Sequence, residues 1–126
     1  MGYVYADIEL ANSREANLES VSVNALVDAG SLMLCIPEHL KVQLNFEEAE
    51  KREVILADGK RHLVSYVGPV RVKFQNRSCF VGALVLGDQV LLGAMPMEDM
   101  DLVVSPSNRT ITVNPENPNY AVALVK

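Results

Sequence analysis

The stretch VSVNALVDAGS, residues 21–31, is the part of the sequence from which the rest of the fold can be inferred. It alternates apolar and polar residues and becomes continuously apolar at residues 25–27, as expected of a strand that enters a packed interior. A carboxylate, Asp28, follows this strand directly and leads into a turn of small residues at 29–31. A charged group at the end of a buried strand is costly unless its neighbours compensate it. Taken alone, the stretch would be explained by an ordinary Asp-x-Gly turn, since such turns are common.

A second stretch, VLLGAMPMEDM at residues 90–100, repeats the same plan. It predicts an apolar strand, a turn at Gly93 and a short helix. We expect Pro96 in the first turn of that helix, and the acidic residues 98–99 near the positive end of the helix dipole. The two stretches are therefore predicted to share one plan of apolar strand, glycine turn and short helix.

Between these stretches lies the clearest hairpin signal of the chain, EVILADGKRHLV at residues 53–64. The pair Asp58-Gly59 between two β-prone arms predicts a two-residue turn whose twist matches the strands. The hairpin is either a plain surface feature or part of a binding site.

This order of parts resembles the retroviral-type (retropepsin-like) aspartic proteases, and specifically their small single-domain prokaryotic relatives, over residues 3–113. In that family an Asp-Thr-Gly or Asp-Ser-Gly loop precedes a flap hairpin, and a hydrophobic-hydrophobic-glycine element then leads into a helix. The resemblance implies an all-β or mainly β fold, a closed barrel of the acid-protease type with one or two short helices. It also implies one domain over residues 1–126 and a homodimer.

The resemblance assigns roles to three short segments of the chain. The residues concerned are Asp28 for catalysis, Ala29, Gly30 and Ser31 for support of the catalytic loop, Ala57, Asp58, Gly59 and Lys60 for the substrate-binding flap, and Leu91, Leu92 and Gly93 for the hydrophobic-glycine element.

Hydrolysis of a peptide by carboxylates needs two of them, one ionised to take a proton from water and one protonated to polarise the scissile carbonyl. Two carboxylates held about 3 Å apart cannot both ionise, so they share a proton. This chain has one such loop, since the second half offers Leu92-Gly93 without an acid. A symmetric dimer in which Asp28 of each subunit meets at the two-fold axis would complete the pair.

Ala29 departs from the family, in which a Thr or Ser hydroxyl bridges the two loops across the axis. Each lost hydrogen bond costs on the order of 1 kcal/mol, which would loosen the pair of carboxylates. A natural variant with weak activity, a non-catalytic relative and a deliberate substitution all stay open. The Gly30 amide is expected to support the Asp28 carboxylate, and Ser31 either bonds that carboxylate or satisfies its own backbone.

Composition excludes several other functions. The formal charge of −5 argues against a nucleic-acid surface, and no apolar run is long enough to cross a bilayer. The N-terminus lacks a basic or secretory segment, so we expect a cytoplasmic protein. The chain's two cysteines, Cys35 and Cys79, are expected to be reduced and buried, with a disulfide as the other option. With these cysteines so widely separated, His39 and His62 make no recognisable metal site, and no cofactor is expected.

The remaining chain predicts further elements. Strands are expected at residues 3–10, 32–36, 70–74, 78–86, 101–104, 109–113 and 120–125, a short helix at 37–44, exposed turns at 11–18 and a solvated connection at 46–52. Gly68-Pro69 should break the chain, and Met95, Met97 and Met100 should pack in the core. The apolar terminal strand would need cover from its own sheet or from a second subunit.

These interpretations give one leading function and two alternatives. The leading one is an aspartic endopeptidase that hydrolyses peptides or unfolded proteins by general acid–base catalysis, without a cofactor or covalent intermediate. A peptide-binding dimer that keeps the groove without turnover, a pseudo-protease, is favoured by Ala29. A purely structural β-domain is the third.

Overall fold

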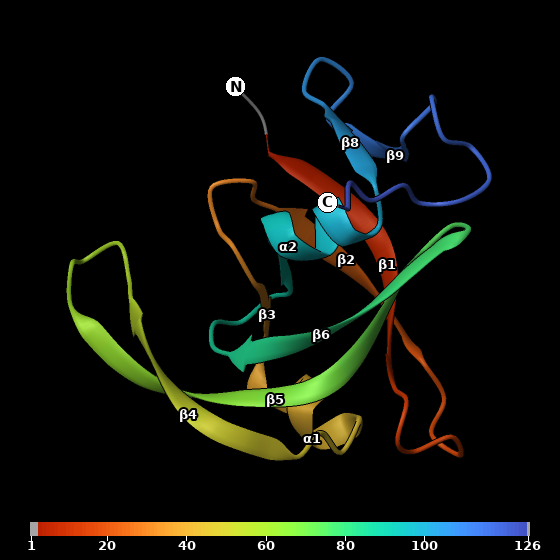
Figure 1. Ribbon diagram of the computed structural model, residues 1–126. Helices are drawn as coiled ribbons and strands as arrows, with labels where there is room; N and C mark the ends of the chain where they lie inside the picture. The colour runs from red at the N-terminus through yellow and green to blue at the C-terminus, as the bar shows by residue number, and fades with distance from the viewer. Residues whose placement is uncertain (1–2, 126) are drawn as a thin grey trace.

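The computed structural model of this chain describes residues 3–125 and is built mainly from strands (Figure 1). The elements are β1 (Val4–Asn12), β2 (Val21–Val27), β3 (Leu34–Ile36), α1 (Glu38–Gln43), β4 (Glu48–Ile55), β5 (Arg61–Phe74), β6 (Arg77–Val85), β7 (Leu91–Leu92), α2 (Ala94–Asp99), β8 (Leu102–Ser105) and β9 (Thr110–Val113).

The main sheet closes into a barrel. Its strands follow the order β1-β2-β7-β3-β6-β5-β4, and a further pairing of β1 with β5 joins the two sides. Six strands therefore form the barrel, while β4 and the adjoining arm of β5 extend away from it as a long hairpin (Figure 1). Closure removes the exposed edges of the barrel strands. The predicted closed, mainly β barrel with short helices is confirmed.

Alternation of apolar and polar residues explains the first two strands. Ala6, Ile8 and Leu10 of β1 are buried, and the residues between them are more exposed. β1 pairs antiparallel with β2 over seven residues, from Val4 opposite Val27 to Leu10 opposite Val21. The predicted antiparallel return of the strand before Asp28 is confirmed.

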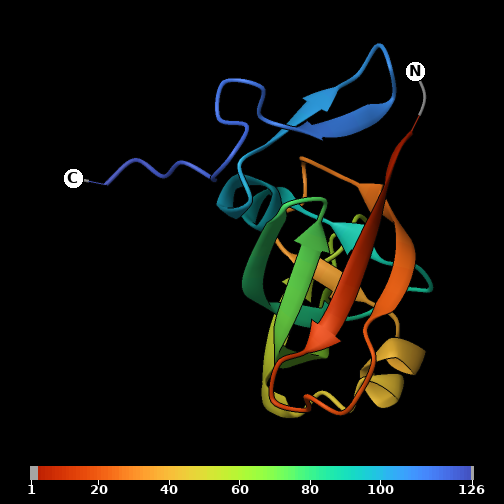
Figure 2. The same cartoon turned by 90° about the vertical axis from the view of Figure 1, so that its right-hand side faces the viewer.

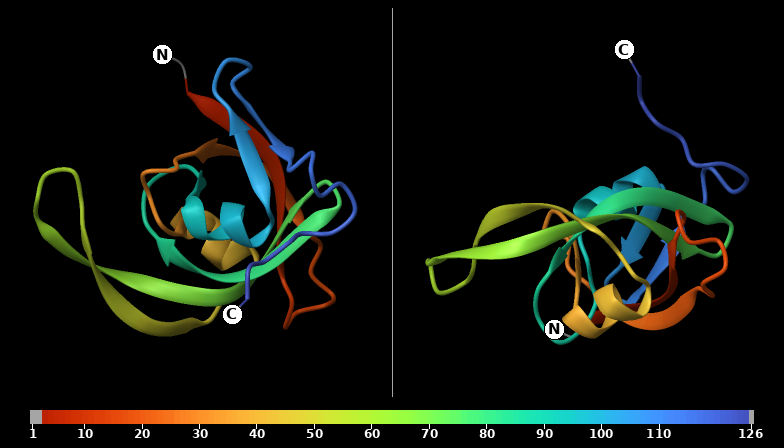
Figure 3. Two further views of the ribbon diagram at one scale, coloured as in Figure 1. Left: turned by 45° about the horizontal axis from the view of Figure 1, so that its top comes forward. Right: turned by 90° about the horizontal axis from the view of Figure 1, so that it is seen from below.

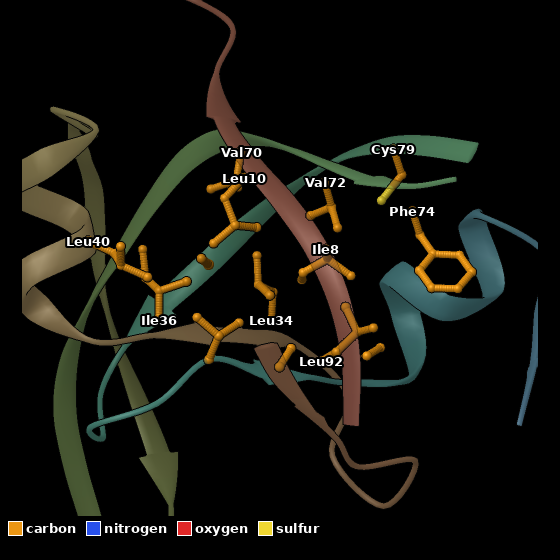
Figure 4. Packing of buried hydrophobic residues seen from close by; sticks show 14 of the residues in the cluster. Ile8, Leu10, Leu34, Ile36, Leu40, Val70, Val72, Phe74, Cys79 and Leu92 are labelled. Atoms are coloured by element: carbon orange, nitrogen blue, oxygen red, sulfur yellow. The ribbon is translucent and has the colours of Figure 1, made fainter. Parts of the chain in front are cut away.

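The core fills the inside of the barrel (Figure 4). Its side chains come from β1, β3, β5, β6 and β7 and from α1, and include Ile8, Leu10, Leu34, Ile36, Leu40, Val70, Val72 and Leu92. Full burial of each such side chain stabilises the fold by about 1.5–3 kcal/mol. The core therefore fixes the strand ends that carry the candidate site.

The predicted chain break at Gly68-Pro69 is wrong, because β5 continues through it. The register of β5 with β6 shifts between Val67 and Val70, so the pair forms a bulge within one strand. Proline cannot donate to a strand ladder and is commonly found at such bulges. A Cβ on Gly68 would lie 3.3 Å from the Cα of Gly82, so the two strands approach closely here.

Two further predictions near the barrel are corrected. Residues 46–52 are not a solvated connection, because Phe46 is buried and β4 begins at Glu48. Pairing with β5 satisfies the β4 backbone while its charged side chains stay exposed. The predicted strand at 32–36 is shortened to β3, because the Leu32 carbonyl accepts a hydrogen bond from the Met95 amide of α2 and not from a strand. The Leu32 side chain is exposed.

The predicted short helices are both present. Pro96 lies in the first turn of α2, where backbone amides have no intrahelical acceptor. Glu98 and Asp99 lie in the last turn, so the prediction that they sit at the positive end of the dipole is wrong. Met97 and Met100 are buried as expected, whereas Met95 is half exposed.

The C-terminal part of the chain forms the predicted hairpin, β8 with β9, and then an extended segment. Residues 120–125 form no strand, which corrects the prediction of a terminal strand. This segment runs away from the barrel (Figure 2). None of the described helices has the length and apolar character that a membrane span requires.

Candidate active site

Asp28 is the first residue after β2, and its backbone is tied to the second stretch. β2 runs parallel to β7, with Leu26 opposite Leu91 and Val27 opposite Leu92. The Asp28 amide donates a hydrogen bond of 3.0 Å to the carbonyl oxygen of Leu92. The ends of the two apolar strands therefore fix where the carboxylate leaves the barrel.

The loop after β2 orients the Asp28 carboxylate. The Gly30 amide donates a hydrogen bond of 3.0 Å to Oδ1 of Asp28, as the sequence predicts. A Cβ on Gly30 would lie 3.3 Å from the same oxygen, so a larger residue would crowd it. The Ser31 amide donates to the Asp28 backbone carbonyl over 3.1 Å. Among residues 3–125 no hydrogen bond joins the Ser31 hydroxyl to Asp28, so Ser31 acts through its backbone.

The loop that contains Gly93, after β7, is hydrogen-bonded to the loop that follows Asp28. The amides of Ala94 and Met95 each donate a hydrogen bond of 2.8 Å, to the carbonyl oxygens of Ser31 and Leu32 respectively. Gly93 itself is buried against the backbone that follows Asp28. The structure thus brings together residues 28–31 and 91–93, the two segments that the sequence singles out.

An apolar row lies beside Asp28 on the barrel face that points away from the core. Leu26 is opposite Leu91, and Leu91 is opposite Cys35, so these three half-buried residues align across β2, β7 and β3. Alternation places Leu26 on the same face as Asp28, two residues later. Burial raises the pKa of the Cys35 thiol, and the negative charge of Asp28 raises it further.

Sequence reasoning did not assign Leu26 or Cys35 to the site. The period of two in β2 could have found Leu26. Cys35 depends on the pairing of β3 with β7, which joins residues far apart in the sequence. That pairing is tertiary and leaves no local pattern.

The tip of the β4–β5 hairpin carries Ala57, Asp58, Gly59 and Lys60, all of them exposed. The turn has three residues between Leu56 and Lys60, which corrects the predicted two-residue turn. The Leu56 amide donates to the Lys60 carbonyl over 3.2 Å, the Gly59 amide donates to Leu56, and Gly59 has φ of 79°. This is a three-residue hairpin loop whose last residue is a left-handed glycine, another common hairpin connection.

The hairpin projects from the barrel with its tip in solvent (Figure 3, left). Ile55 and Leu63, on its two arms, are both exposed apolar residues. Among residues 3–125 no hydrogen bond joins the tip to the Asp28 loop. The hairpin is therefore available to contact something other than its own barrel.

The remaining chemical groups do not form a second centre. Cys35 and Cys79 are free thiols, and Cys79 is buried next to the carbonyl oxygen of Pro96. Within residues 3–125 no three His, Cys, Asp or Glu side chains are grouped so that they could hold a metal ion.

Comparison with known proteins places this geometry in a fold class. No family model and no curated protein matches the chain. Solved structures do match: the EIAV protease complexed with an inhibitor aligns with a TM-score of 0.59 and 16% identity over 78% of this chain and 88% of that one.

Two further structures agree. The retroviral protease-like domain of Ddi1 from Leishmania major has a TM-score of 0.56 and 11% identity, over 89% of this chain and 90% of that one. The solution structure of the Simian Foamy Virus (mac) protease has a TM-score of 0.50 and 19% identity, over 74% and 90%. The chain therefore has a retropepsin-like fold, as its sequence motifs suggested. Two of these structural neighbours are retroviral proteases, and the third is a retroviral protease-like domain.

Proposed function

We propose that this protein is an aspartic endopeptidase that acts as a homodimer, with Asp28 of each subunit as one half of the catalytic pair. The main support is that Asp28 and Gly93 lie on two interlocked strand ends of a retropepsin-like barrel. A fold alone does not define a function, so the proposal depends on the chemistry of this loop.

In the proposed reaction one carboxylate of the pair is ionised and the other is protonated. The ionised one accepts a proton from water as the oxygen attacks the carbonyl carbon, and the protonated one donates its proton to the carbonyl oxygen. Collapse of the tetrahedral intermediate breaks the C–N bond, with a proton passing to the leaving amine. No bond forms between enzyme and substrate.

A single chain supplies one carboxylate to this reaction, since the second loop carries Leu92 and Gly93 where an acid would be needed. The second carboxylate comes from a second copy related by a two-fold axis. Assembly and activity are then one event, and specific activity rises with protein concentration.

The substrate is proposed to be an extended peptide or an unfolded protein. The exposed hairpin tip, Ala57 to Lys60, would close over it and pair with its backbone as an added strand. The apolar row of Leu26, Leu91 and Cys35 would contact an apolar side chain next to the scissile bond.

A peptide-binding dimer without turnover is the second candidate. Ala29 is exposed and offers no side-chain hydrogen bond, where the aspartic proteases that the sequence resembles have a hydroxyl between the two loops. Such a protein would keep the hairpin and the apolar row and lose the rigid carboxylate pair.

The experiment is hydrolysis of a fluorescently labelled unfolded protein from acidic to neutral pH. We expect Asp28→Asn to abolish cleavage and Ala29→Thr to raise it. Glu19→Gln removes an exposed carboxylate that precedes β2, at the opposite end of this strand from Asp28, and should leave cleavage unchanged. Cleavage that survives Asp28→Asn would remove Asp28 from the mechanism. Absence of cleavage in all variants, together with equal peptide binding by the parent and Asp28→Asn, would establish the non-catalytic alternative.

A further inference from the structure

The last described segment of the chain, residues 120–125, is an apolar arm in solvent. Tyr120 is 83% exposed and Leu124 is fully exposed, and Val122 and Val125 are also open to solvent. The arm leaves the body of the protein close to α2 (Figure 2; Figure 3, right). Removing the apolar side chains of such an uncharged segment from water stabilises the protein.

One aspartate, Asp101 between α2 and β8, holds the arm at Val122. Asp101 accepts hydrogen bonds from Asn114 Nδ2 at 3.1 Å, from Asn117 Nδ2 at 2.8 Å and from the Val122 amide at 3.1 Å. The segment from Asn114 to Val122 is therefore held, and residues 123–125 lie beyond this anchor.

The arm borders an open cleft of about 600 Å³. On one side the cleft is lined by Phe80 and Met95, and on the other by Val122 and Leu124. Phe80 of β6 is 61% exposed and Met95 of α2 is 48% exposed, so two large apolar side chains face the cleft without cover. We call the surface formed by these two residues the Phe80–Met95 groove.

We propose that the arm closes on the Phe80–Met95 groove of its own chain, as an intramolecular strap. Val122 and Leu124 are two residues apart, so in an extended segment their side chains point to the same side. Both line the cleft that separates them from the groove. Closure brings four exposed apolar side chains together and expels the water between them.

The anchor explains why the arm would close on its own chain and not on a second copy. Leu124 follows the hydrogen-bonded Val122 by two residues, and each residue spans at most about 3.5 Å. The arm is therefore confined beside its own groove at a high effective concentration, with little loop-closure entropy to lose. Residues 120–125 carry no charge, so the acidic residues Glu98 and Asp99 at the rim do not repel them.

Closure would also brace the loop that carries Asp28. Met95 forms the groove wall with its side chain, and its amide holds the carbonyl oxygen of Leu32 at 2.8 Å. A strap across Met95 restrains α2 against the backbone that follows Asp28. This consequence does not depend on the proposed protease activity.

The absence of tryptophan from the chain gives a direct test. Leu124→Trp introduces a single tryptophan beyond the anchor, and Tyr120→Trp places one within the held segment, at a residue that does not line the cleft. We expect Leu124→Trp, and not Tyr120→Trp, to emit at shorter wavelength and to be protected from acrylamide. Addition of Phe80→Asp should abolish both effects, whereas Val103→Asp, at an exposed apolar residue of β8, should leave them unchanged.

Two outcomes would overturn the strap. One is a Leu124→Trp emission typical of a solvent-exposed residue and insensitive to Phe80→Asp. The other is exchange of arms between copies. It would appear as protection of the tryptophan that arises only as protein concentration rises, or as protection of the Leu124→Trp, Phe80→Asp chain after it is mixed with parent protein, which has no tryptophan. Because all readouts are fluorescence, an inactive protein would leave this test unaffected.

Discussion

Gly93 packs directly against the backbone of Leu32: a Cβ atom on Gly93 would lie 2.7 Å from the carbonyl carbon of Leu32. Real Cβ atoms do not approach backbone so closely, so no other residue fits without a shift of one loop. The glycine of the second stretch is therefore explained by packing. It allows the loop after β7 to hold the loop that carries Asp28.

We expect Gly93→Ala to destabilise the protein by about 1–3 kcal/mol, the usual cost of forcing extra atoms into a packed site. Urea unfolding monitored by circular dichroism measures this free energy. Gly87→Ala is the matched control, because a Cβ there meets open space although φ is 82°. Its cost should be only the backbone strain, about 1 kcal/mol. Equal losses in the two variants would contradict the packing role of Gly93.

A second prediction concerns Asn12, which is buried at the end of β1. Its Nδ2 donates to the carbonyl oxygens of Leu44 at 2.9 Å and Asn45 at 3.1 Å, and its Oδ1 accepts from the Arg14 amide at 3.0 Å. Asn12→Ala leaves buried carbonyl groups without partners and should cost about 1–3 kcal/mol.

Asn24→Ala is the control for this prediction, because Asn24 is exposed and makes one surface hydrogen bond, of 2.9 Å, to Asp7. Its unfolding free energy should change by less than about 0.5 kcal/mol. A similar small change for Asn12→Ala would show that water replaces the buried bonds. The sequence places Asn12 in an exposed turn, so its role emerges only from the contact between β1 and the end of α1.

Short-range sequence patterns predicted several elements of the fold correctly. Alternation in β1 and β2, the glycine turns at Gly30 and Gly93, and the Asp-Gly hairpin are all short-range signals, and all correspond to observed elements. Residues 48–52 of β4 were missed because they are charged, mostly exposed and without apolar alternation, whereas the rest of the strand lies in the predicted hairpin. Such a strand is specified by its partner β5 and not by its own composition.

The candidate site also has residues that a local motif predicts and residues that only tertiary pairing places there. Asp28 and the Gly30 amide follow from a contiguous motif, and the structure joins them as expected. Cys35 lies beside Asp28 only because β3 pairs with β7, which no local pattern reveals. The arm at 120–125 was predicted as a strand from its apolar residues, but strand formation needs a neighbouring edge, and among residues 3–125 no strand pairs with it.

A third prediction follows from the anchor of the arm. Hydrogen bonds from Asn114, Asn117 and the Val122 amide lower the pKa of Asp101 below its usual value. Because the folded pKa is the lower one, the unfolded chain takes up the proton first as pH falls. The stabilisation by Asp101 is therefore present above the unfolded pKa of about 3.9 and is lost progressively below it.

Urea midpoints measured between neutral pH and about pH 2 test this prediction. We expect the midpoint of Asp101→Asn to fall less in acid than that of the parent, because the variant has no proton to take up at this position. Asp99→Asn, which removes an exposed carboxylate two residues earlier, should leave the acid dependence close to that of the parent. Identical acid profiles for the parent and Asp101→Asn would show that the anchor does not contribute to stability.

The fourth prediction concerns alkaline pH and Cys79. Burial, and to a smaller extent the charge of Asp99, raises the pKa of the Cys79 thiol to about 12. The unfolded thiol titrates near 9.0, so above that pH the unfolded chain loses a proton that the folded chain keeps. Stability should then fall between about pH 9 and 12, with a slope for this residue of at most about 1.4 kcal/mol per pH unit.

In Cys79→Val this contribution is absent, so its unfolding free energy should decline less steeply over the same range. Tyrosine and lysine side chains titrate there as well, and comparison of the two proteins removes their shared contribution. Parallel curves for the parent and Cys79→Val would mean that solvent reaches the thiol before the protein unfolds, and that β6 opens locally next to α2.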